Sequence, residues 1–356
     1  MPDISSNAMD DNPTLAHVEF YVRDAAVTAA ELRRKYGFGI VATAGTAGSG
    51  TDRYSLALRQ GNITLIATQG EVAEAYVERH GDGVADIAFR VGDVRSAFTA
   101  AVRAGARAVR RPGDSGRGDA ATAVFGDVTH TLLSRDKSLP PDFSAVRPEY
   151  EVRGAGLQEL DHFAVCAEAG ELGGLVDFWQ RAFGFRSVFR EYISVGDQGM
   201  NSEVVQSAGG DTTFTIIEPD PQARSGQIDA FLTAHRGVGI QHVALNTRNI
   251  VATLDRLSGE GVQTLDVPDS YYDSLPDRVT VSEYPAHSLR KFGILADEDH
   301  NGRLFQVFTR SVHPRRTFFF EVLQRCGAET FGSNNIKALY SAVESERLLS
   351  AAETWQ

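Results

Sequence analysis

The sequence predicts an α+β fold in which two tandem domains are each built from a pair of βαβββ modules around a curved sheet. Three observations lead to this expectation. The chain has 356 residues, enough for about two domains of roughly 150 residues each. Two long segments repeat each other with the same spacing of glycine and proline. Segments with strand-like alternation accompany each expected helix at corresponding places in both halves.

The repeat is clearest between "HGDGVADIAFRVGDVRSAFTAAVRAGARAVRRP" and "HRGVGIQHVALNTRNIVATLDRLSGEGVQTLDVP", in which two glycines and a proline recur 156 positions apart. The matching pairs are Gly83 and Gly239, Gly105 and Gly261, and Pro112 and Pro268. Because glycine and proline set backbone geometry at turns, the same turns are expected to recur in both segments. Such a repeat indicates duplicated supersecondary units.

A second repeat relates "LAHVEFYV" to "LDHFAVCA", so that four modules are expected in all. They open near His17, Asp86, His162 and His242. Their later strands are rich in β-branched and aromatic residues, and include "NITLIATQ", "VTHTLLS", "TTFTIIEP" and "RLFQVFT". We expect a disordered tail at residues 1–13, a first domain at 14–140, a linker rich in proline and charge at 141–156, and a second domain at 157–356.

The composition narrows the class of function. The net charge is −12 without a long basic run, which argues against nucleic acid or an anionic membrane as a partner. No apolar stretch is long enough to span a membrane, and the first residues lack a signal-peptide pattern, so we expect a cytoplasmic protein. The two cysteines, Cys166 and Cys326, suggest no disulfide framework, and Cys166 is expected in the core. A homodimer is one assembly that the sequence allows.

Histidines open the two modules of the second half at matching positions. His162 lies in the strand-like segment "LDHFAVC", and His242 lies in "GIQHVAL". The corresponding residues of the first half are His17 and Asp86, so a matched pair of histidines is missing there. We therefore expect the first domain to lack a metal site, and any bound metal ion to lie in the second domain.

Glu321 lies in the apolar segment "TFFFEVLQR" and shares a strand face with Phe319 and Leu323. Burying a carboxylate there without a partner would reduce the stability of the fold, and a bound cation would remove this penalty. Two imidazoles and one carboxylate form the facial triad of non-haem iron(II) oxygenases, which leaves coordination positions open for substrate and O2. The sequence therefore predicts that His162, His242 and Glu321 bind Fe(II).

Each of these residues also has a purely structural explanation. A single strand histidine is more often a satisfied core or surface residue, and Glu321 could pair with an arginine such as Arg325. The matched placement of the two histidines favours the metal site. No GxSxG, CxxC or Walker motif indicates a competing chemistry. The other histidines, expected mostly in polar loops and given no role, are His80, His130, His235, His287, His300 and His313.

Over nearly its whole length, and most strongly from residue 157 onward, the sequence resembles the 4-hydroxyphenylpyruvate dioxygenase family of the vicinal-oxygen-chelate superfamily. The segments that carry the resemblance are "DHFAV", "GIQHVAL", "PDSYYDSL", "RLFQVFTRSVHPRRTFFFEVLQR" and "FGSNNIKALYSAVE". The resemblance implies the vicinal-oxygen-chelate fold and a C-terminal helix. It places the family's iron ligands on His162, His242 and Glu321, and makes the second domain the catalytic one.

Two activities of this family use the same substrate. The dioxygenases form homogentisate, whereas hydroxymandelate synthase forms 4-hydroxymandelate, a precursor of hydroxyphenylglycine in glycopeptide antibiotics. Dioxygenases typically read "PINEP" where this chain reads "TIIEP", so Thr215 and Ile217 replace a proline and an asparagine. They read "GNFKALF" where this chain reads "NNIKALY", so Ile336 and Tyr340 replace two phenylalanines. These departures resemble hydroxymandelate synthase.

The resemblance also implies a substrate pocket formed by Ser202, Thr215, Ile217, Gln306, Phe308, Phe319, Ile336 and Tyr340. No catalytic residue beyond the metal ligands is expected. The implied reaction converts 4-hydroxyphenylpyruvate and O2 to 4-hydroxymandelate and CO2, by oxidative decarboxylation and benzylic hydroxylation at Fe(II).

Three alternatives stay open. The chain could be a dioxygenase that makes homogentisate. It could be an extradiol ring-cleaving dioxygenase, which has similar halves and a similar triad but lacks the C-terminal helix motif. It could also be a ligand-binding protein of the same fold without enzymatic activity, against which the intact metal ligands argue.

Overall fold

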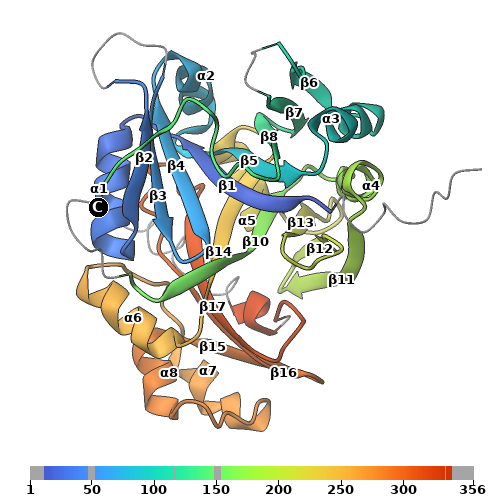
Figure 1. Cartoon of the computed structure of the whole chain (residues 1–356). Coiled ribbons are helices and arrows are strands. Elements are labelled where there is room, and N and C mark those ends of the chain that lie inside the picture. Colours follow the sequence, from blue (N-terminus) through green and yellow to red (C-terminus); the bar gives the residue numbers. More distant parts are fainter. Residues whose placement is uncertain (1–11, 47–52, 115–117, 148–153, 333, 339–356) are drawn as a thin grey trace, which may run out of the picture.

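The computed structural model describes residues 12–46, 53–114, 118–147, 154–332 and 334–338. Two large sheets dominate this part of the chain, one of nine and one of eight strands. Each sheet contains two βαβββ modules, so the predicted fold class is confirmed (Figure 1). Within the described residues, no helix has the length and apolar character needed to cross a lipid bilayer.

The first sheet has the strand order β6-β7-β8-β5-β1-β4-β3-β2-β9. Its first module contains β1 (Thr14–Tyr21), α1 (Ala25–Tyr36), β2 (Gly39–Ala44), β3 (Tyr54–Gln60) and β4 (Ile63–Gln69), and α2 (Glu71–His80) follows it. Its second module contains β5 (Gly83–Val91), α3 (Val94–Arg103), β6 (Arg107–Arg110), β7 (Ala120–Phe125) and β8 (Val128–Ser134). The short strand β9 (Ser144–Ala145), inside the segment expected to be a linker, pairs with the edge strand β2.

The second sheet has the strand order β11-β12-β13-β10-β14-β17-β16-β15. Its first module contains β10 (Leu157–Cys166), α4 (Leu172–Phe183), β11 (Arg186–Val195), β12 (Gln198–Gln206) and β13 (Thr213–Pro219), and α5 (Gln227–His235) follows it. Its second module contains β14 (Gly239–Thr247), α6 (Ile250–Gly259), β15 (Leu295–Asp299), β16 (Gly302–Phe308) and β17 (Phe319–Cys326). Between α6 and β15 this module also carries α7 (Asp269–Asp273), η1 (Leu275–Asp277) and α8 (Ala286–Phe292).

Corresponding helices of the two halves begin and end in the same way. Asp93 and Asn249 cap α3 and α6, and each side chain accepts a hydrogen bond from the backbone three residues further on. Gly37 and Gly184 end α1 and α4 in the left-handed conformation, with φ of 74° and 68°. Glycine adopts this conformation without steric cost, which explains why it recurs at the same point of each module.

Strand pairing follows one rule in all four modules. The first strand of each module pairs in parallel with its last strand, as β10 does with β13 and β14 with β17. The two first strands of each half pair with each other in antiparallel fashion, as β1 does with β5 and β10 with β14. The strands β10, β14 and β17 are therefore neighbours in the second sheet. His162, His242 and Glu321 lie on these three strands.

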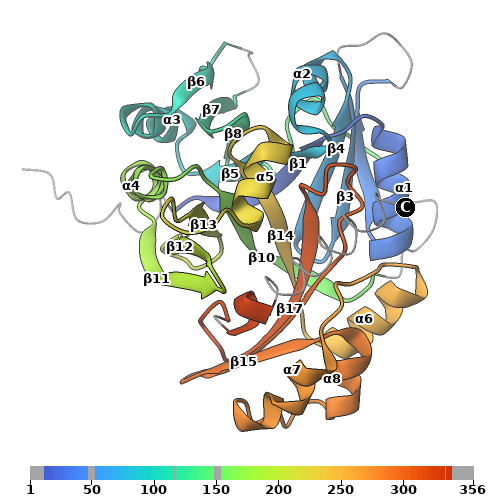
Figure 2. The same ribbon diagram turned by 180° about the vertical axis from the view of Figure 1, so that it is seen from behind.

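The two halves share a hydrophobic core at the junction of α3 and α4, which lie side by side in both views (Figures 1 and 2). The largest fully buried side chain is Trp179 of α4, whose ring stacks on Phe214 at 4.4 Å between ring centroids and contacts Phe125 of the first sheet at 5.6 Å. Burial of such rings is the main apolar contribution to stability. The halves are thus packed against each other through aromatic side chains.

The expectation that the remaining histidines lie mostly in polar loops is wrong for four of them. His80 ends α2, His235 ends α5, and His130 lies in β8, and all three are buried. His287 lies in α8 and is exposed. Burial lowers the pKa of His130 to about 4, which keeps its ring neutral. The neighbours of the three buried histidines along the chain are polar, but the other half of the molecule covers them. Local sequence therefore gave no sign that His80 and His235 are buried, whereas His130 lies in the segment "VTHTLLS" that was predicted to be a strand.

Candidate metal centre

His162, His242 and Glu321 converge in the second sheet, and all three are buried. One ligand atom from each lies within 4.8 Å of the others. The Nε2 atoms of His162 and His242 each lie 3.4 Å from Oε2 of Glu321. Among the described residues, this is the group of metal-binding side chains that the structure brings together.

Neighbouring side chains fix which atoms point to the centre of this cluster. Nδ1 of His162 lies 2.9 Å from a carboxylate oxygen of Asp161, so Nε2 is the nitrogen left to face the other ligands. The amide of Gln306 donates a hydrogen bond of 2.8 Å to Oε1 of Glu321, so Oε2 faces the histidines. Such partners orient ligands and select the histidine tautomer in metal sites. These contacts therefore leave Nε2 of His162 and Oε2 of Glu321 facing each other, 3.4 Å apart.

The dimensions of the cluster suit a small divalent cation. Two ligand atoms each about 2.1 Å from one ion and at a right angle lie about 3 Å apart, close to the 3.4 Å found here. Two imidazole nitrogens and one carboxylate oxygen are the donor set that non-haem Fe(II) enzymes use. The residues present therefore fit the metal that the sequence predicts.

The pKa shifts of the three clustered side chains also favour a bound cation. Burial by itself would lower the pKa of His162, but the Glu321 carboxylate and hydrogen bonds to Asp161 and Glu321 raise this pKa to about 9. Burial would raise the pKa of Glu321, yet the histidines lower it to about 2. Burial lowers the pKa of His242. A divalent cation would take the place of the proton on His162, so metal binding should release it.

Aromatic rings enclose the two histidines. Phe319 stacks on His242 with ring centroids 4.9 Å apart, and Phe331 lies edge-on to His162 at 5.4 Å. Phe308 contacts His242 at 6.1 Å. These rings restrict the orientation of the imidazoles and limit access of water to the ligand atoms.

Strand register places the predicted pocket residues that lie on strands on the same face of the sheet as His162, His242 and Glu321. Side chains on paired residues of neighbouring strands point to the same side. In β13, Thr215 and Ile217 pair with Ala164 and Cys166 of β10. Ala164 and Cys166 lie two and four residues after His162, so they share its face of the strand. The remaining pairs that share this face are Ser202 with Ile217, Phe308 with Glu321, and Phe319 with His242. The inner face of the curved sheet therefore carries both sets of residues.

The pocket residues differ in what they contact. Thr215 is buried, and its hydroxyl has no hydrogen-bond partner in the described structure. Ile217 belongs to an apolar cluster with Cys166 and Met200, against which Ile336 packs. Tyr340 lies outside the described residues.

Sequence reasoning missed the side chains that hold the ligands in place. Arg325 forms a two-pronged ion pair with Asp161, behind His162, rather than with Glu321. The side-chain oxygen of Gln306 accepts a hydrogen bond of 2.8 Å from Asn335, and Tyr271 in turn donates to Asn335 at 3.1 Å. Asp161 is the immediate neighbour of His162, so the adjacent acid was the one local signal that could have indicated a supporting residue.

Among the described residues of the first sheet, no comparable set of metal-binding side chains comes together. Asp86 pairs with Thr129 in the same register as His242 with Phe319, so Thr131 occupies the place of Glu321. Both threonine hydroxyls donate hydrogen bonds to Asp86, at 2.5 and 2.6 Å. Glu19, the cross-strand partner of Asp86, forms an ion pair of 2.9 Å with Arg53. Protein groups therefore satisfy the polar atoms of Asp86 and Glu19 in the first sheet, so these atoms are already paired.

Two family models match the chain. Residues 13–128 match the model described as "Hydroxyphenylpyruvate dioxygenase, HPPD, N-terminal", and residues 159–307 match "Glyoxalase/Bleomycin resistance protein/Dioxygenase superfamily". The boundaries of these matches fall in the first and second halves that the duplication defines.

Similar proteins match over nearly the full length. The 4-hydroxyphenylpyruvate dioxygenase of Aspergillus fumigatus is 30% identical, with 94% of this chain and 92% of the relative covered. That of Coccidioides posadasii is 31% identical with the same coverage. A solved structure of a triple mutant of 4-hydroxymandelate synthase from Streptomyces coelicolor is 43% identical, with a TM-score of 0.85 over 95% of this chain and 99% of the other.

Proposed function

Because the chain belongs to the 4-hydroxyphenylpyruvate dioxygenase family, we propose that it binds Fe(II) and converts 4-hydroxyphenylpyruvate and O2 to 4-hydroxymandelate and CO2. One oxygen atom enters the new carboxylate and the other becomes the benzylic hydroxyl, so the 2-oxo acid supplies the electrons. A supply of 4-hydroxymandelate for hydroxyphenylglycine, and hence for glycopeptide antibiotics, is the role that this product suggests.

The metal ligands would be His162, His242 and Glu321. When bound, Fe(II) supplies the redox chemistry that activates O2 and the open positions on which a 2-oxo acid can chelate. The protein orients His162 through Asp161 and Glu321 through Gln306. No side chain needs to act as a general base in this scheme.

The observation that carries the choice of product is the apolar cluster beside the metal ligands. Ile217 and Ile336 both contact it, and both replace residues that are polar or aromatic in typical dioxygenases. An apolar wall near the side chain of the substrate favours a pose with the benzylic carbon, rather than the ring, nearest the metal. A barrier difference of about 1.4 kcal/mol already changes the product ratio tenfold.

Other inner-face residues would position the aromatic ring. Phe308 and Phe319 offer rings to pack against it, and both contact His242. The unpartnered hydroxyl of Thr215 can donate a hydrogen bond to a substrate oxygen. An unpaired buried hydroxyl is costly, so a bound ligand would remove that cost.

Formation of homogentisate is the second candidate, because the curated relatives named above are dioxygenases at about 30% identity. The two candidates are separated by loading the protein with Fe(II) without oxygen, adding 4-hydroxyphenylpyruvate, admitting O2 and analysing the products by chromatography. We expect 4-hydroxymandelate and one CO2 for each substrate. Homogentisate as the main product would replace the first proposal by the second, and the absence of any turnover would contradict both.

A further inference from the structure

Two histidines that open corresponding repeat segments meet where the two halves pack together. His80 begins the segment "HGDGVADIAF" and ends α2, whereas His235 begins "HRGVGIQHVAL" and ends α5. Their rings are stacked, with centroids 4.2 Å apart and an interplanar angle of 23°, and both residues are buried. We call these two residues the histidine pair. The duplication therefore brings one histidine from each half into direct contact.

The last turn of each half packs against a helix end of the other half. Gly126 of the β7–β8 turn lies so close to Val238, which follows α5, that a Cβ atom on the glycine would be 2.3 Å from the carbonyl oxygen of Val238. His313 of the β16–β17 loop lies against Gly81, which follows α2, and a Cβ atom there would be 2.3 Å from its ring. The histidine pair thus lies in a junction that both halves form in the same way.

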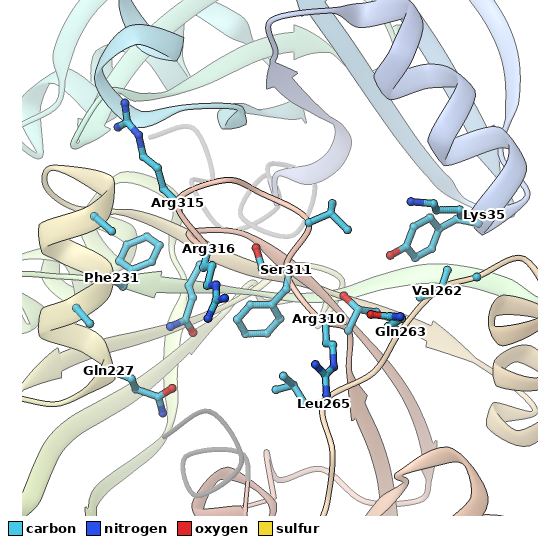
Figure 3. Close-up of a pocket in the computed structure, with 18 residues that line it drawn as sticks. Lys35, Gln227, Phe231, Val262, Gln263, Leu265, Arg310, Ser311, Arg315 and Arg316 are labelled. Carbon is cyan, nitrogen blue, oxygen red and sulfur yellow. The ribbon is translucent and has the colours of Figure 1, made fainter. Parts of the chain in front are cut away.

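The C-terminal ends of α2 and α5 both accept hydrogen bonds from the other half. Nδ1 of His80 lies 2.7 Å from the backbone carbonyl oxygen of His235. Arg315 extends from the β16–β17 loop toward α2, where its guanidinium donates to the carbonyl of Glu78 at 3.0 Å (Figure 3). The last carbonyls of a helix carry partial negative charge and attract cations. Both helix ends therefore favour a positively charged partner.

Both ring nitrogens of His80 face atoms that can only accept a hydrogen bond. Nδ1 faces the carbonyl of His235, and Nε2 lies 2.8 Å from a carboxylate oxygen of Asp127 in the β7–β8 turn. Burial alone would raise the pKa of Asp127, but its hydrogen bond with His80 and the charge of Arg79 lower it, so this carboxylate is ionised at neutral pH. Neither acceptor has a hydrogen to offer. Both contacts therefore require a proton on each nitrogen of His80, which gives the ring a positive charge.

His235 is the neutral member of the histidine pair. Burial and the neighbouring His80 lower its pKa to about 4. Its Nδ1 lies 2.9 Å from the carbonyl oxygen of Gly237, so this nitrogen carries the one proton of the ring. Two charged rings 4.2 Å apart would repel each other. The pair therefore holds a single positive charge, on the ring that contacts Asp127.

The helix α5 connects the histidine pair to the surroundings of the metal centre. Phe231, four residues before His235, stacks on it with ring centroids 5.0 Å apart. Phe231 also belongs to the apolar cluster that contains Ile217. It lines a cavity of about 690 Å³ where the two halves meet, and the wall of this cavity also contains Phe319, the ring that stacks on His242 (Figure 3). The position of α5 therefore sets one side of the space beside the metal centre.

We propose that His80 is a positioning residue: its ring is charged in the folded protein at neutral pH and, held by Asp127, clamps the C-terminal end of α5 to the first half. A neutral ring can donate to only one of the two acceptors, so loss of the proton opens the clamp. In an unfolded chain a histidine is mostly neutral above pH about 7. The clamp therefore contributes fully to the free energy of unfolding below pH about 6, and this contribution falls as the pH rises.

The surrounding groups leave His80 as the one expected to change charge near neutral pH. Burial lowers the pKa of both His235 and His313, which keeps these rings neutral. Arginines keep their charge throughout this range. Among the described residues, the ionisable side chains that act on His80 or on its partners are Tyr76, Arg79, Asp82, Arg107, Asp127, His235, His313 and Arg315.

NMR of the histidine ring nitrogens tests the charge of His80 without any turnover. The protein is labelled with ¹⁵N-histidine and loaded with one equivalent of Zn(II), which is diamagnetic. At pH 7.5 both ring nitrogens of His80, assigned by their absence in His80→Gln, should have the shifts of a protonated ring. Asp127→Asn should give the neutral pattern, because it removes the acid that holds the charge. A neutral His80 in the wild type would overturn the inference.

The matched control for Asp127→Asn is Glu74→Gln. It removes one negative charge from an exposed position of α2 that does not contact the histidine pair. His80 should remain charged in this variant. A neutral His80 in Glu74→Gln as well as in Asp127→Asn would show that the overall charge of the region, and not Asp127, holds the proton, and would overturn the clamp.

Kinetics test the positioning role, and this part of the inference rests on the proposed function. When α5 is held less firmly, only a fraction of the molecules has it in place, and the apparent affinity for substrate falls by that fraction. At pH 7, His80→Gln and Asp127→Asn should raise KM for 4-hydroxyphenylpyruvate about tenfold, with kcat changed less than about twofold. Glu74→Gln should match the wild type. Raising the pH to 9 should increase KM of the wild type but not of His80→Gln, which has no charge to lose.

An unchanged KM in His80→Gln, or the same pH profile of KM in that variant and the wild type, would overturn the positioning role. Amide hydrogen exchange of residues 227–238 gives a second readout, and it should be about tenfold faster in both clamp variants than in Glu74→Gln. Equal exchange in all these proteins would contradict the clamp. If the wild-type protein does not turn over 4-hydroxyphenylpyruvate, the proposed function fails, whereas NMR and hydrogen exchange still decide whether His80 holds α5.

Discussion

Asp161 and Arg325 form a two-pronged ion pair, with nitrogen–oxygen distances of 2.8 and 2.9 Å, directly behind the ring of His162. The same carboxylate accepts a hydrogen bond from Nδ1 of His162. Burial alone would raise the pKa of Asp161, but Arg325 and His162 hold it well below its usual range. The ion pair therefore keeps a negative charge in place behind a proposed metal ligand.

Replacing Asp161 by asparagine should weaken metal binding. The amide keeps an oxygen near His162 but loses the charge and one prong of the pairing with Arg325. Loss of such a supporting carboxylate typically costs about 10–100-fold in metal affinity. Competition with a chelator measures the Fe(II) dissociation constant. The control Glu203→Gln breaks another ion pair of the same sheet, with Arg190, and should leave the affinity unchanged. An unchanged affinity in Asp161→Asn would show that the pair has only a structural role.

The metal ligands themselves give the second prediction. Alanine at His162, His242 or Glu321 should abolish turnover and remove most bound iron, because each supplies one of the converging donor atoms. His17→Ala should leave the iron content per folded protein unchanged, since the ring of His17 is used within the first half to contact the carbonyl of Ser138 at 2.9 Å. Elemental analysis after gel filtration provides the measurement. Full iron occupancy in His242→Ala would contradict the assignment.

Product choice gives the third prediction. The double variant Ile217→Asn and Ile336→Phe should increase ring-oxidised products at the expense of 4-hydroxymandelate. The asparagine introduces an amide into the apolar cluster, and the phenylalanine fills space beside it. Overpacking can cost about 1–3 kcal/mol, so the melting temperature is compared first. A folded, active variant that still forms only 4-hydroxymandelate would show that other residues, such as Thr215, decide the product.

The buried carboxyl group of Asp86 gives a prediction about pH. Burial and the Glu19 carboxylate, opposed by hydrogen bonds from Thr129 and Thr131, raise its pKa to about 7. The folded state thus retains a proton that the unfolded chain has released above pH about 4. The free energy of unfolding should therefore fall as pH rises from 4.5 to 7.5, by on the order of 3 kcal/mol from this group.

Urea unfolding of the wild type and of Asp86→Asn at both pH values isolates this contribution. The asparagine carries no charge at either pH, so the variant should show a clearly flatter dependence than the wild type. Titration of the other groups is common to both proteins and cancels in the comparison. Parallel pH profiles would mean that Asp86 is charged, or uncharged, in both states throughout this range.

The sequence was sufficient to predict the architecture and the cluster of His162, His242 and Glu321, because both follow from the duplication. Glycines that end corresponding helices recur in the two halves, and residues at corresponding strand positions share a face. Comparing the halves also showed that the first half lacks the second histidine of the cluster, since Asp86 stands where the second half has His242. Strand register extends this difference to Thr131, which replaces Glu321 and which the sequence comparison alone had not identified.

Comparing the two halves could not predict the contacts that hold the clustered side chains in place. Asp161 and Arg325 are 164 positions apart, and no local pattern connects them. The cavity where the two halves meet likewise combines Lys35 of the first half with Arg316 of the second, and no repeat or spacing in the sequence connects the two positions. Such contacts depend on how the two halves pack, which a periodic pattern does not encode.

The strands that carry the three ligands are neighbours in the sheet but are separated by about eighty residues along the chain. During synthesis the site cannot exist until β17 has emerged and paired, so iron uptake should follow folding of the second half rather than guide it. An ion that binds only this completed state then stabilises it by mass action, by about 2.7 kcal/mol when free metal is a hundredfold above its dissociation constant. The lifetime of the protein in a cell should accordingly rise and fall with the supply of iron.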